Sequence, residues 1–150
     1  MTSIPVFAVR NVSFAYDNRQ TALQNVNLTV QPGESLVILG ANGSGKSTLL
    51  KLLDGLYYPT EGEILAFVEP LTEAHLRDDA FNFSFRRRVG LVFQDSDVQL
   101  FCPSVMDEVA FAPLQLGFNH EEVGRRVDEA LQALRIEKLR DRAPHRLSGG

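Results

Sequence analysis

Eight consecutive residues in the first third of the chain have the types and spacing of a phosphate-binding loop. Glycines allow successive backbone N–H groups to turn inward around an anion. The lysine adds a compact cation for the β- and γ-phosphates, and the final serine offers a hydroxyl to Mg²⁺. The segment therefore predicts a nucleotide-phosphate site, and its sequence is Gly40-Ala41-Asn42-Gly43-Ser44-Gly45-Lys46-Ser47.

Other glycine-rich sites fit this segment less well. A dinucleotide-binding fingerprint needs Gly-x-Gly-x-x-Gly, but the third residue after Gly45 is Thr48. A GTPase would carry an Asn-Lys-x-Asp segment, and the sequence has none. Two alternatives stay open: another P-loop NTPase, such as a small-molecule kinase, and a chain that acts only as a nucleotide-binding or partner-binding module.

A phosphate-binding loop needs a buried strand before it and a helix after it, and the flanking sequence predicts both. Residues 35–39 form a short apolar run that is typical of a parallel strand buried on both faces. Leucines then recur at helical spacing over residues 49–56, and Gly55 is suited to end that helix. Before the loop, alternating apolar residues over 6–30 predict antiparallel strands with a turn at residues 17–18.

The second half of the chain is predicted to be mainly helical. Residues 59–88 have no clean period and are predicted as a turn, a strand and a loop, and residues 89–93 as another buried strand. Ser104 with Asp107, and Asn119 with Glu122, are typical of helix N-caps. Pro113 should end or bend the first helix. Apolar residues at helical spacing over 123–134 predict that the second helix packs on a core.

Composition limits the classes of partner. The chain has 150 residues with 15 Lys+Arg and 19 Asp+Glu, so its formal net charge is 15 − 19 = −4. This sign disfavours a protein that coats nucleic acid, and Arg86-Arg87-Arg88 is interpreted as the solvated start of a strand. One cysteine, Cys102, cannot form an internal disulfide framework, which favours a reducing compartment. No apolar run is long enough to predict a membrane span.

Taken together, these features resemble the ATP-binding subunits of ABC transporters over essentially the whole length. Tyr16 lies 24 residues before Gly40, where the family has an aromatic residue that stacks on adenine. Gln94 follows the predicted strand 89–93, as does the family's Q-loop glutamine, which approaches Mg²⁺ and the attacking water. The resemblance implies catalytic roles for Lys46 and Gln94, magnesium ligation by Ser47 and Gln94, and nucleotide contacts that include Tyr16 and Thr48.

The last four residues, Leu147-Ser148-Gly149-Gly150, resemble the start of the family signature Leu-Ser-Gly-Gly-Gln. In that family the serine and glycines bind the γ-phosphate of ATP held by the partner's phosphate loop, so that two subunits enclose two nucleotides. The resemblance implies ATP and Mg²⁺ as cofactors. It implies a second ATP-binding subunit, identical or different, and a transmembrane transporter subunit as partners, with no nucleic acid. The implied location is peripheral, at the cytoplasmic face of the cell membrane.

Two stretches are similar to a narrower subgroup, the ATPases of energy-coupling-factor importers and of cobalt or nickel uptake systems. They are Gln99-Leu100-Phe101 and the Val-Ala-Phe-Ala-Pro run at 109–113, where Ala112 replaces a glycine. This similarity implies import of a metal ion such as cobalt or nickel, or of a vitamin. Residues 65–88 depart from the family, in which a short Asp-Gly hairpin is expected.

The expected fold class is α/β, a P-loop NTPase of the ABC type. We expect an N-terminal antiparallel β subdomain and part of a RecA-like parallel core in residues 1–94, and a helical subdomain ending in the signature in residues 95–150. ATP hydrolysis also needs an aspartate and a glutamate, which the family places after the signature, whereas this sequence ends at Gly150. The chain is therefore predicted to be the N-terminal part of an ATPase and to be inactive alone.

Overall fold

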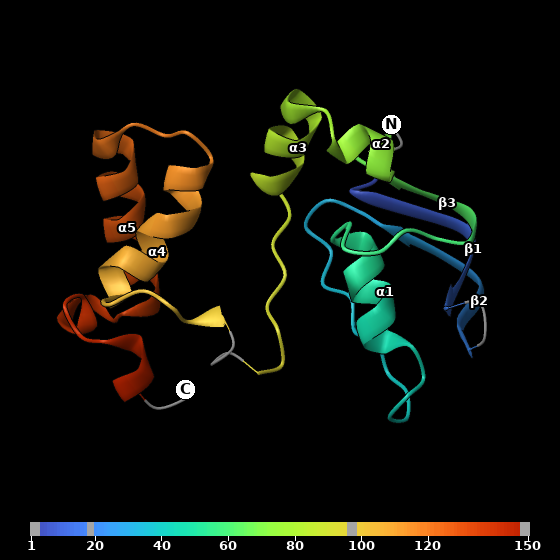
Figure 1. Ribbon diagram of the computed structural model, residues 1–150, viewed down its shortest axis with the longest axis horizontal. Helices are drawn as coiled ribbons and strands as arrows, with labels where there is room; N and C mark the ends of the chain where they lie inside the picture. Colours follow the sequence, from blue (N-terminus) through green and yellow to red (C-terminus); the bar gives the residue numbers. More distant parts are fainter. Residues whose placement is uncertain (1–3, 18–19, 96–98, 148–150) are drawn as a thin grey trace. The chain divides into compact units, whose positions relative to one another are not determined.

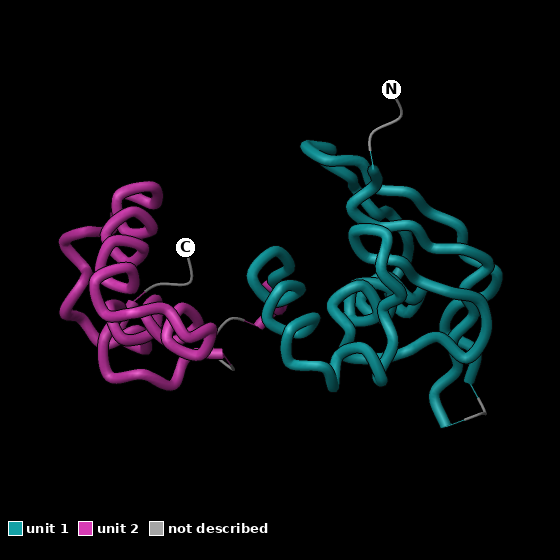
Figure 2. Tube along the Cα trace, turned by 90° about the horizontal axis from the view of Figure 1, so that it is seen from above, with its two compact units in different colours: residues 1–91 teal, residues 92–150 magenta. Residues whose placement is uncertain are grey.

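The computed structural model describes residues 4–17, 20–95 and 99–147. They form two compact units, Met1–Leu91 and Val92–Gly150, which Figure 2 shows in separate colours. The sequence had predicted a division after residue 94. Each unit is considered by itself below.

Unit 1 contains a four-stranded antiparallel sheet in the order β2-β1-β3-β4, and Figure 1 labels its three longer strands. The central strand β1 pairs with β2 on one side and with β3 on the other. The alternating pattern over residues 6–30 predicted antiparallel strands, and β1 and β2 confirm it. The bounds are Phe7–Tyr16 for β1, Gln20–Val30 for β2, Glu61–Ala66 for β3 and Glu69–Pro70 for β4.

Gly62 lies inside β3, in a segment whose sequence resembles a turn. Its φ is +79°, and a Cβ on it would lie 2.4 Å from the carbonyl oxygens of Arg10 and Asn11. The pairing of β1 with β3 shifts register between Arg10 and Ser13. A glycine at this point therefore permits a bulge, and the strand continues instead of reversing.

Helix α1, Lys46–Leu53, packs on the sheet through its apolar side. Leu49 and Leu52 are buried in one core with Val12 of β1 and Ile64 of β3. Burying an aliphatic side chain of this size contributes about 1.5–3 kcal/mol. Gly55, with φ +70°, follows the end of the helix, as the sequence predicted.

Residues 59–88, predicted as a turn, a strand and a loop, contain the strands β3 and β4 and, where a loop was predicted, two helices, α2 (Glu73–Leu76) and α3 (Asp79–Arg86). The carboxylate of Asp78 accepts the backbone N–H of Phe81 at 2.9 Å and so caps α3. Phe81 and Phe85 are one helical turn apart, with ring centroids 6.1 Å apart and the rings stacked. The sequence did not predict α3 because the stretch through its phenylalanines has no clean period, whereas the cap at Asp78 starts a helix.

The arginine run lies at the end of α3, so its interpretation as the start of a strand was also wrong. Arg86 donates hydrogen bonds to the carbonyl oxygen of Asp54 at 2.8 Å and to its carboxylate at 3.2 Å, at the C-terminal end of α1. Burial raises the pKa of Asp54, and the charge of Arg86 opposes that shift. The Arg88 guanidinium lies 3.1 Å from the ring centroid of Phe67. These contacts attach residues 73–88 to the rest of unit 1.

The two runs predicted as buried parallel strands, 35–39 and 89–93, are not strands among the described residues. Val37, Leu39 and Val92 are 75%, 87% and 85% exposed. A buried strand needs backbone hydrogen-bond partners along its edges as well as apolar side chains. In the part of the chain that the structure describes, the sheet is antiparallel and ends at β2 and β4. The described residues therefore do not form the parallel part of the expected core.

Unit 2 contains the helices α4 (Val105–Gln115) and α5 (His120–Leu134), which Figure 1 labels, followed by two short 3₁₀ helices, Glu137–Leu139 and Pro144–Arg146. Both predicted N-caps are confirmed. The Ser104 hydroxyl accepts the N–H of Asp107 at 3.1 Å, and the Asn119 side chain accepts that of Glu122 at 2.9 Å. Helix α4 ends two residues after Pro113, in agreement with the prediction for this proline.

The core of unit 2 lies between α4 and α5. Val105 from α4 and Val123, Val127 and Leu131 from α5 are buried together. The predicted apolar stripe on α5 is confirmed for the three α5 residues of this core, while Leu134 at the end of the helix is largely exposed.

We predict that Glu122→Gln lowers the stability of unit 2 at neutral pH and leaves it unchanged in strong acid. Hydrogen bonds from Arg125 at 2.6 and 2.8 Å are the main cause that lowers the pKa of Glu122 from 4.5 to about 2, and Arg126 adds a third at 2.7 Å. A carboxyl group with a lowered pKa stabilises the fold above its unfolded-state pKa, and this contribution is lost as the pH falls from 4.5 to about 2.

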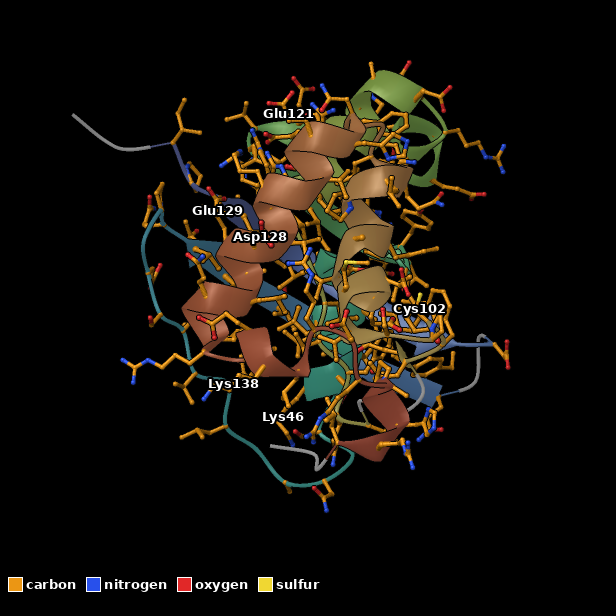
Figure 3. The ribbon with its side chains drawn as sticks, turned by 90° about the vertical axis from the view of Figure 1, so that its left-hand side faces the viewer. Lys46, Cys102, Glu121, Asp128, Glu129 and Lys138 are labelled. Carbon is orange, nitrogen blue, oxygen red and sulfur yellow. The ribbon has the colours of Figure 1, made fainter. Side chains whose placement is uncertain are left out.

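The measurement is the melting temperature of each protein at a series of pH values between about 6 and about 2. The difference between the variant and the unchanged chain should be largest at about pH 6 and should be small at about pH 2, where the Glu122 carboxyl is half protonated in the folded chain. Glu121→Gln, at the preceding position of α5 (Figure 3), is the matched control, since it removes a carboxylate from the same helical turn and leaves the bonds of Glu122 to Arg125 and Arg126 in place. A Glu122→Gln difference that is the same at both ends of the range would contradict the prediction.

Candidate functional site

The glycine-rich segment leads directly into α1, whose first residue is Lys46 (Figure 3). Gly43 and Gly45 have φ angles of +81° and +90°, and the N–H of Ser44 donates to the carbonyl of Ala41 at 3.2 Å. The N-cap residue is Gly45, and no side chain caps the helix start. The first N–H groups of a helix have no intrahelical partner, and together they form the positive end of the helix dipole, which here faces the loop. This is an arrangement that binds anions.

Lys46 folds back over the loop that precedes it. Its Nζ donates hydrogen bonds to the carbonyl oxygens of Gly40 at 2.8 Å and of Ala41 at 2.7 Å. These acceptors are neutral, and charged phosphate oxygens are stronger partners for an ammonium group. The Lys46 ammonium and the N-terminus of α1 thus both face the loop, where an anion would meet two positive groups.

Among the loop glycines, Gly45 is the one at which a side chain would meet backbone. A Cβ on it would lie 2.5 Å from the carbonyl oxygen of Ala22 and 2.7 Å from Cδ2 of Leu23, both on β2. A Cβ on Gly43 would have no heavy atom within 4 Å beyond its own chain neighbours. The loop backbone therefore passes directly against β2 at Gly45 and is open at Gly43.

Tyr16, the last residue of β1, reaches the same helix. Its hydroxyl lies 2.9 Å from Oγ1 of Thr48 in the first turn of α1. Thr48 is 7% exposed, and Tyr16 is 37% exposed. The structure thus brings together the predicted base-stacking residue and the predicted phosphate-binding residues Lys46 and Thr48.

Ser47 is exposed in the first turn of α1. Its hydroxyl, next to Lys46 and the helix start, suits a magnesium ion that arrives with a nucleotide. Such an ion takes most of its ligands from phosphate oxygens and water.

The remaining predicted residues belong to unit 2. Gln94 is an exposed residue of unit 2, whereas the loop belongs to unit 1. The strand predicted to precede Gln94 is absent from the described residues. Ser148, Gly149 and Gly150 lie outside the described residues. The roles of these four residues stay predictions.

Sequence reasoning missed Tyr57 as a neighbour of the site. Its ring stacks on Phe14 with centroids 5.4 Å apart, and the Lys51 ammonium lies 5.5 Å from its centroid. It also meets the Tyr16 ring at a right angle, 5.7 Å away. The only available signal was an aromatic pair, Tyr57-Tyr58, directly after the predicted helix end, and spacing alone does not show which strand it contacts.

We expect Gly45→Ala to destabilise unit 1 by more than Gly43→Ala. Each variant places alanine at positive φ, which costs about 1–2 kcal/mol. Only at Gly45 would the new methyl group also meet backbone, 2.5 Å from the Ala22 oxygen, so its loss should be at least about twice as large. Denaturant unfolding of both variants measures the difference. Equal losses would show that β2 does not restrict the loop.

Comparison with known proteins identifies the family. Residues 23–150 match the protein family described as ABC transporter. The nickel import ATP-binding protein NikO of Rhodobacter capsulatus is 53% identical over 146 residues, which cover 97% of this chain and 57% of that protein. The energy-coupling factor transporter ATP-binding protein EcfA of Methanoculleus marisnigri is 43% identical over 141 residues, 94% of this chain and 49% of that protein. The chain thus spans about half of the length of these relatives.

Solved structures give the same result. The structure of cbiO1 from Clostridium perfringens, part of the ABC transporter complex cbiONQ, superposes with a TM-score of 0.82 at 34% identity, over 97% of this chain and 57% of that chain. The ATP-binding cassette MJ0796, in a dimeric post-hydrolysis state bound to ADP and Pi, gives a TM-score of 0.78 at 31% identity, over 95% of this chain and 63% of that chain. These likenesses confirm the expected α/β class of the ABC-type P-loop NTPases. Since the family match includes the phosphate loop, most of unit 1 and all of unit 2, this chain belongs to the ATP-binding domains of ABC transporters.

Proposed function

We propose that this chain binds Mg–ATP at the start of α1 and that the whole protein hydrolyses ATP to power import across a membrane. The observation that supports this most is the meeting of three features at one helix start: the Lys46 ammonium, the uncapped N–H groups and the exposed Tyr16 ring. Residues 40–48 would hold the triphosphate and Tyr16 the adenine, as the family resemblance implies.

The loop acts by positioning and by charge, which are the main demands of phosphoryl transfer. Lys46 would exchange its two carbonyl acceptors for β- and γ-phosphate oxygens. The Ser47 hydroxyl would ligate Mg²⁺, whose charge offsets that of the phosphates. We propose that Gln94 orients the attacking water and contributes a further metal contact.

Hydrolysis is proposed for the whole protein and not for these 150 residues alone. The chain spans 57% of NikO, and the family's aspartate and glutamate for Mg²⁺ and water follow the signature. We therefore propose that residues 1–150 bind Mg–ATP weakly and turn it over no faster than background. A chain that acts only as a nucleotide-binding or partner-binding module, the alternative left open by the sequence, would behave in the same way when it is isolated: it would bind and not hydrolyse.

We propose two kinds of partner. The MJ0796 cassette is dimeric and cbiO1 is part of a transporter complex, which supports a second ATP-binding subunit and a transmembrane subunit for this protein. In such a dimer Ser148, Gly149 and Gly150 would contact the ATP of the partner subunit. We place the protein peripherally at the cytoplasmic face of the membrane. No helix in the described residues has the length and apolar character to cross a bilayer.

The cargo that we propose is a metal ion such as nickel or cobalt, or a vitamin. The name of NikO, nickel import ATP-binding protein, and that of EcfA, energy-coupling factor transporter ATP-binding protein, support this class. The stretches Gln99-Leu100-Phe101 and 109–113 link this chain to the same subgroup.

An aromatic pair on unit 2 is our candidate contact for the membrane subunit. Phe101 and Phe111 meet edge to face with centroids 4.8 Å apart, and they are 66% and 41% exposed. Glu108 of α4 fixes the chain here, since its carboxylate accepts the N–H groups of Phe101 at 3.1 Å and of Cys102 at 2.8 Å. Exposed aromatic side chains held in place are typical of protein interfaces.

We expect Lys46→Ala to weaken Mg–ATP binding by at least about tenfold, because one charge-assisted contact to phosphate is lost. Titration calorimetry on residues 1–150 measures the binding. Lys138→Ala, which removes a lysine from unit 2, is the matched control and should bind like the unchanged chain. Steady phosphate release by residues 1–150 that Lys46→Ala abolishes would refute the claim that later residues are required for turnover.

Phe101→Ala should reduce co-purification of the whole protein with its membrane subunit and leave ATP affinity unchanged. The reason is that the variant removes an exposed ring of unit 2, whereas the phosphate loop lies in unit 1. Leu134→Ala removes another exposed apolar side chain of unit 2, at the end of α5, and should have no effect. Undiminished co-purification of Phe101→Ala would exclude this surface.

A further inference from the structure

We propose that Thr48 is a positioning residue: its bond to the Tyr16 hydroxyl holds the Tyr16 ring in place beside α1 and couples binding of the nucleotide base to binding of the phosphates. This inference rests on the proposed function, namely that a nucleoside triphosphate binds at the start of α1. It assigns to Thr48 a role besides a phosphate contact, and to the Tyr16 hydroxyl a role besides stacking.

The bond joins two elements that are distant in sequence. Tyr16 ends β1, and Thr48 lies in the first turn of α1, two residues after Lys46. The hydroxyl oxygens are 2.9 Å apart, within the range of a good O–H···O hydrogen bond. Because Thr48 is 7% exposed, loss of this partner would leave its hydroxyl with little access to water.

Two aromatic contacts restrict the same ring. The plane of Tyr16 lies at 87° to that of Phe14 and at 90° to that of Tyr57, with centroids 5.0 and 5.7 Å apart. Phe14 and Tyr57 are stacked on one another at an interplanar angle of 20°. Moving the Tyr16 ring away about its Cα–Cβ bond would lose the two edge-to-face contacts and the hydrogen bond together. Turning the ring about its own axis would lose only the aromatic contacts, because the hydroxyl oxygen lies on that axis. The exposed part of the ring is therefore presented at a defined angle.

The coupling follows from chain connectivity. Lys46, Ser47 and Thr48 are consecutive residues of one helical turn, so the oxygen that holds Tyr16 lies at a fixed place relative to the groups that would bind the phosphates. Conversely, a ring held in place by Thr48 costs less conformational entropy when a planar base stacks on it. The ligand class is a purine nucleoside triphosphate, in which base and phosphates are joined. Inorganic tripolyphosphate has no base, so its affinity should not depend on the bond between Tyr16 and Thr48.

A double-mutant cycle tests this proposal. Tyr16→Phe keeps the ring and removes the hydroxyl, and Thr48→Val removes the other hydroxyl at similar volume. Affinities for Mg–ATP and for magnesium tripolyphosphate are measured by calorimetry for the unchanged chain, both single variants and the double variant. We expect each single variant to bind Mg–ATP about three- to tenfold more weakly, and the double variant to be no weaker than the weaker single variant.

Two further measurements isolate the positioning role. Tyr16→Phe should bind tripolyphosphate like the unchanged chain, and Thr48→Ser, which keeps a hydroxyl, should restore most of the Mg–ATP affinity. Melting temperatures identify any variant that fails to fold. If Thr48→Val does not fold, Tyr16→Phe against Thr48→Ser still tests the bond, since only the former should lose Mg–ATP affinity.

The outcomes separate this inference from the proposed function. Three results would each overturn the inference. The fold-losses of Mg–ATP affinity of the single variants could multiply in the double variant, Tyr16→Phe could keep its Mg–ATP affinity, or Tyr16→Phe could lose as much affinity for tripolyphosphate as for Mg–ATP. Failure of the unchanged chain to bind either ligand would instead overturn the proposed function.

Discussion

The close approach of Gly45 to β2 is the contact on which the site depends. A side chain at this position would overlap the Ala22 carbonyl, 2.5 Å from the added Cβ, so only glycine lets the loop pass at this distance. That approach brings the first turn of α1 next to the sheet, and with it Lys46 and Thr48. Tyr16 can reach Thr48 only because β1, paired with β2, ends beside this turn.

The other end of α1 is held equally well, and the two anchors together fix the direction of the helix. Arg86 bonds to the carbonyl and carboxylate of Asp54, which satisfies one of the carbonyl groups that a helix leaves open at its end. A Cβ on Gly55 would lie 2.6 Å from Cδ1 of Leu76 in α2. Residues 73–88 thus hold the C-terminal end of the phosphate-binding helix α1 in place, although their sequence departs from the family pattern.

The sequence predicted well those features that a few neighbouring residues determine. The caps at Ser104 and Asn119 need only a side chain and an N–H three residues later, and the loop needs only glycines and a lysine. Strands at 35–39 and 89–93 were predicted from apolar runs alone, but a strand forms only with a pairing partner, which is information from elsewhere in the chain. The bond between Tyr16 and Thr48 spans 32 positions, so no local pattern could have indicated it.

The acidic net charge of −4 is compatible with an anion site because the positive potential is local. The Lys46 ammonium and the first N–H groups of α1 act at contact distance, where a charge-assisted bond is strong. Charges beyond about 8–10 Å are largely screened at physiological ionic strength. In unit 2, moreover, Glu122 and Glu129 are paired with Arg125, and Asp128 with Arg140 (Figure 3 labels Asp128 and Glu129). Phosphate affinity should therefore follow the few groups at the helix start far more than the total charge of the chain.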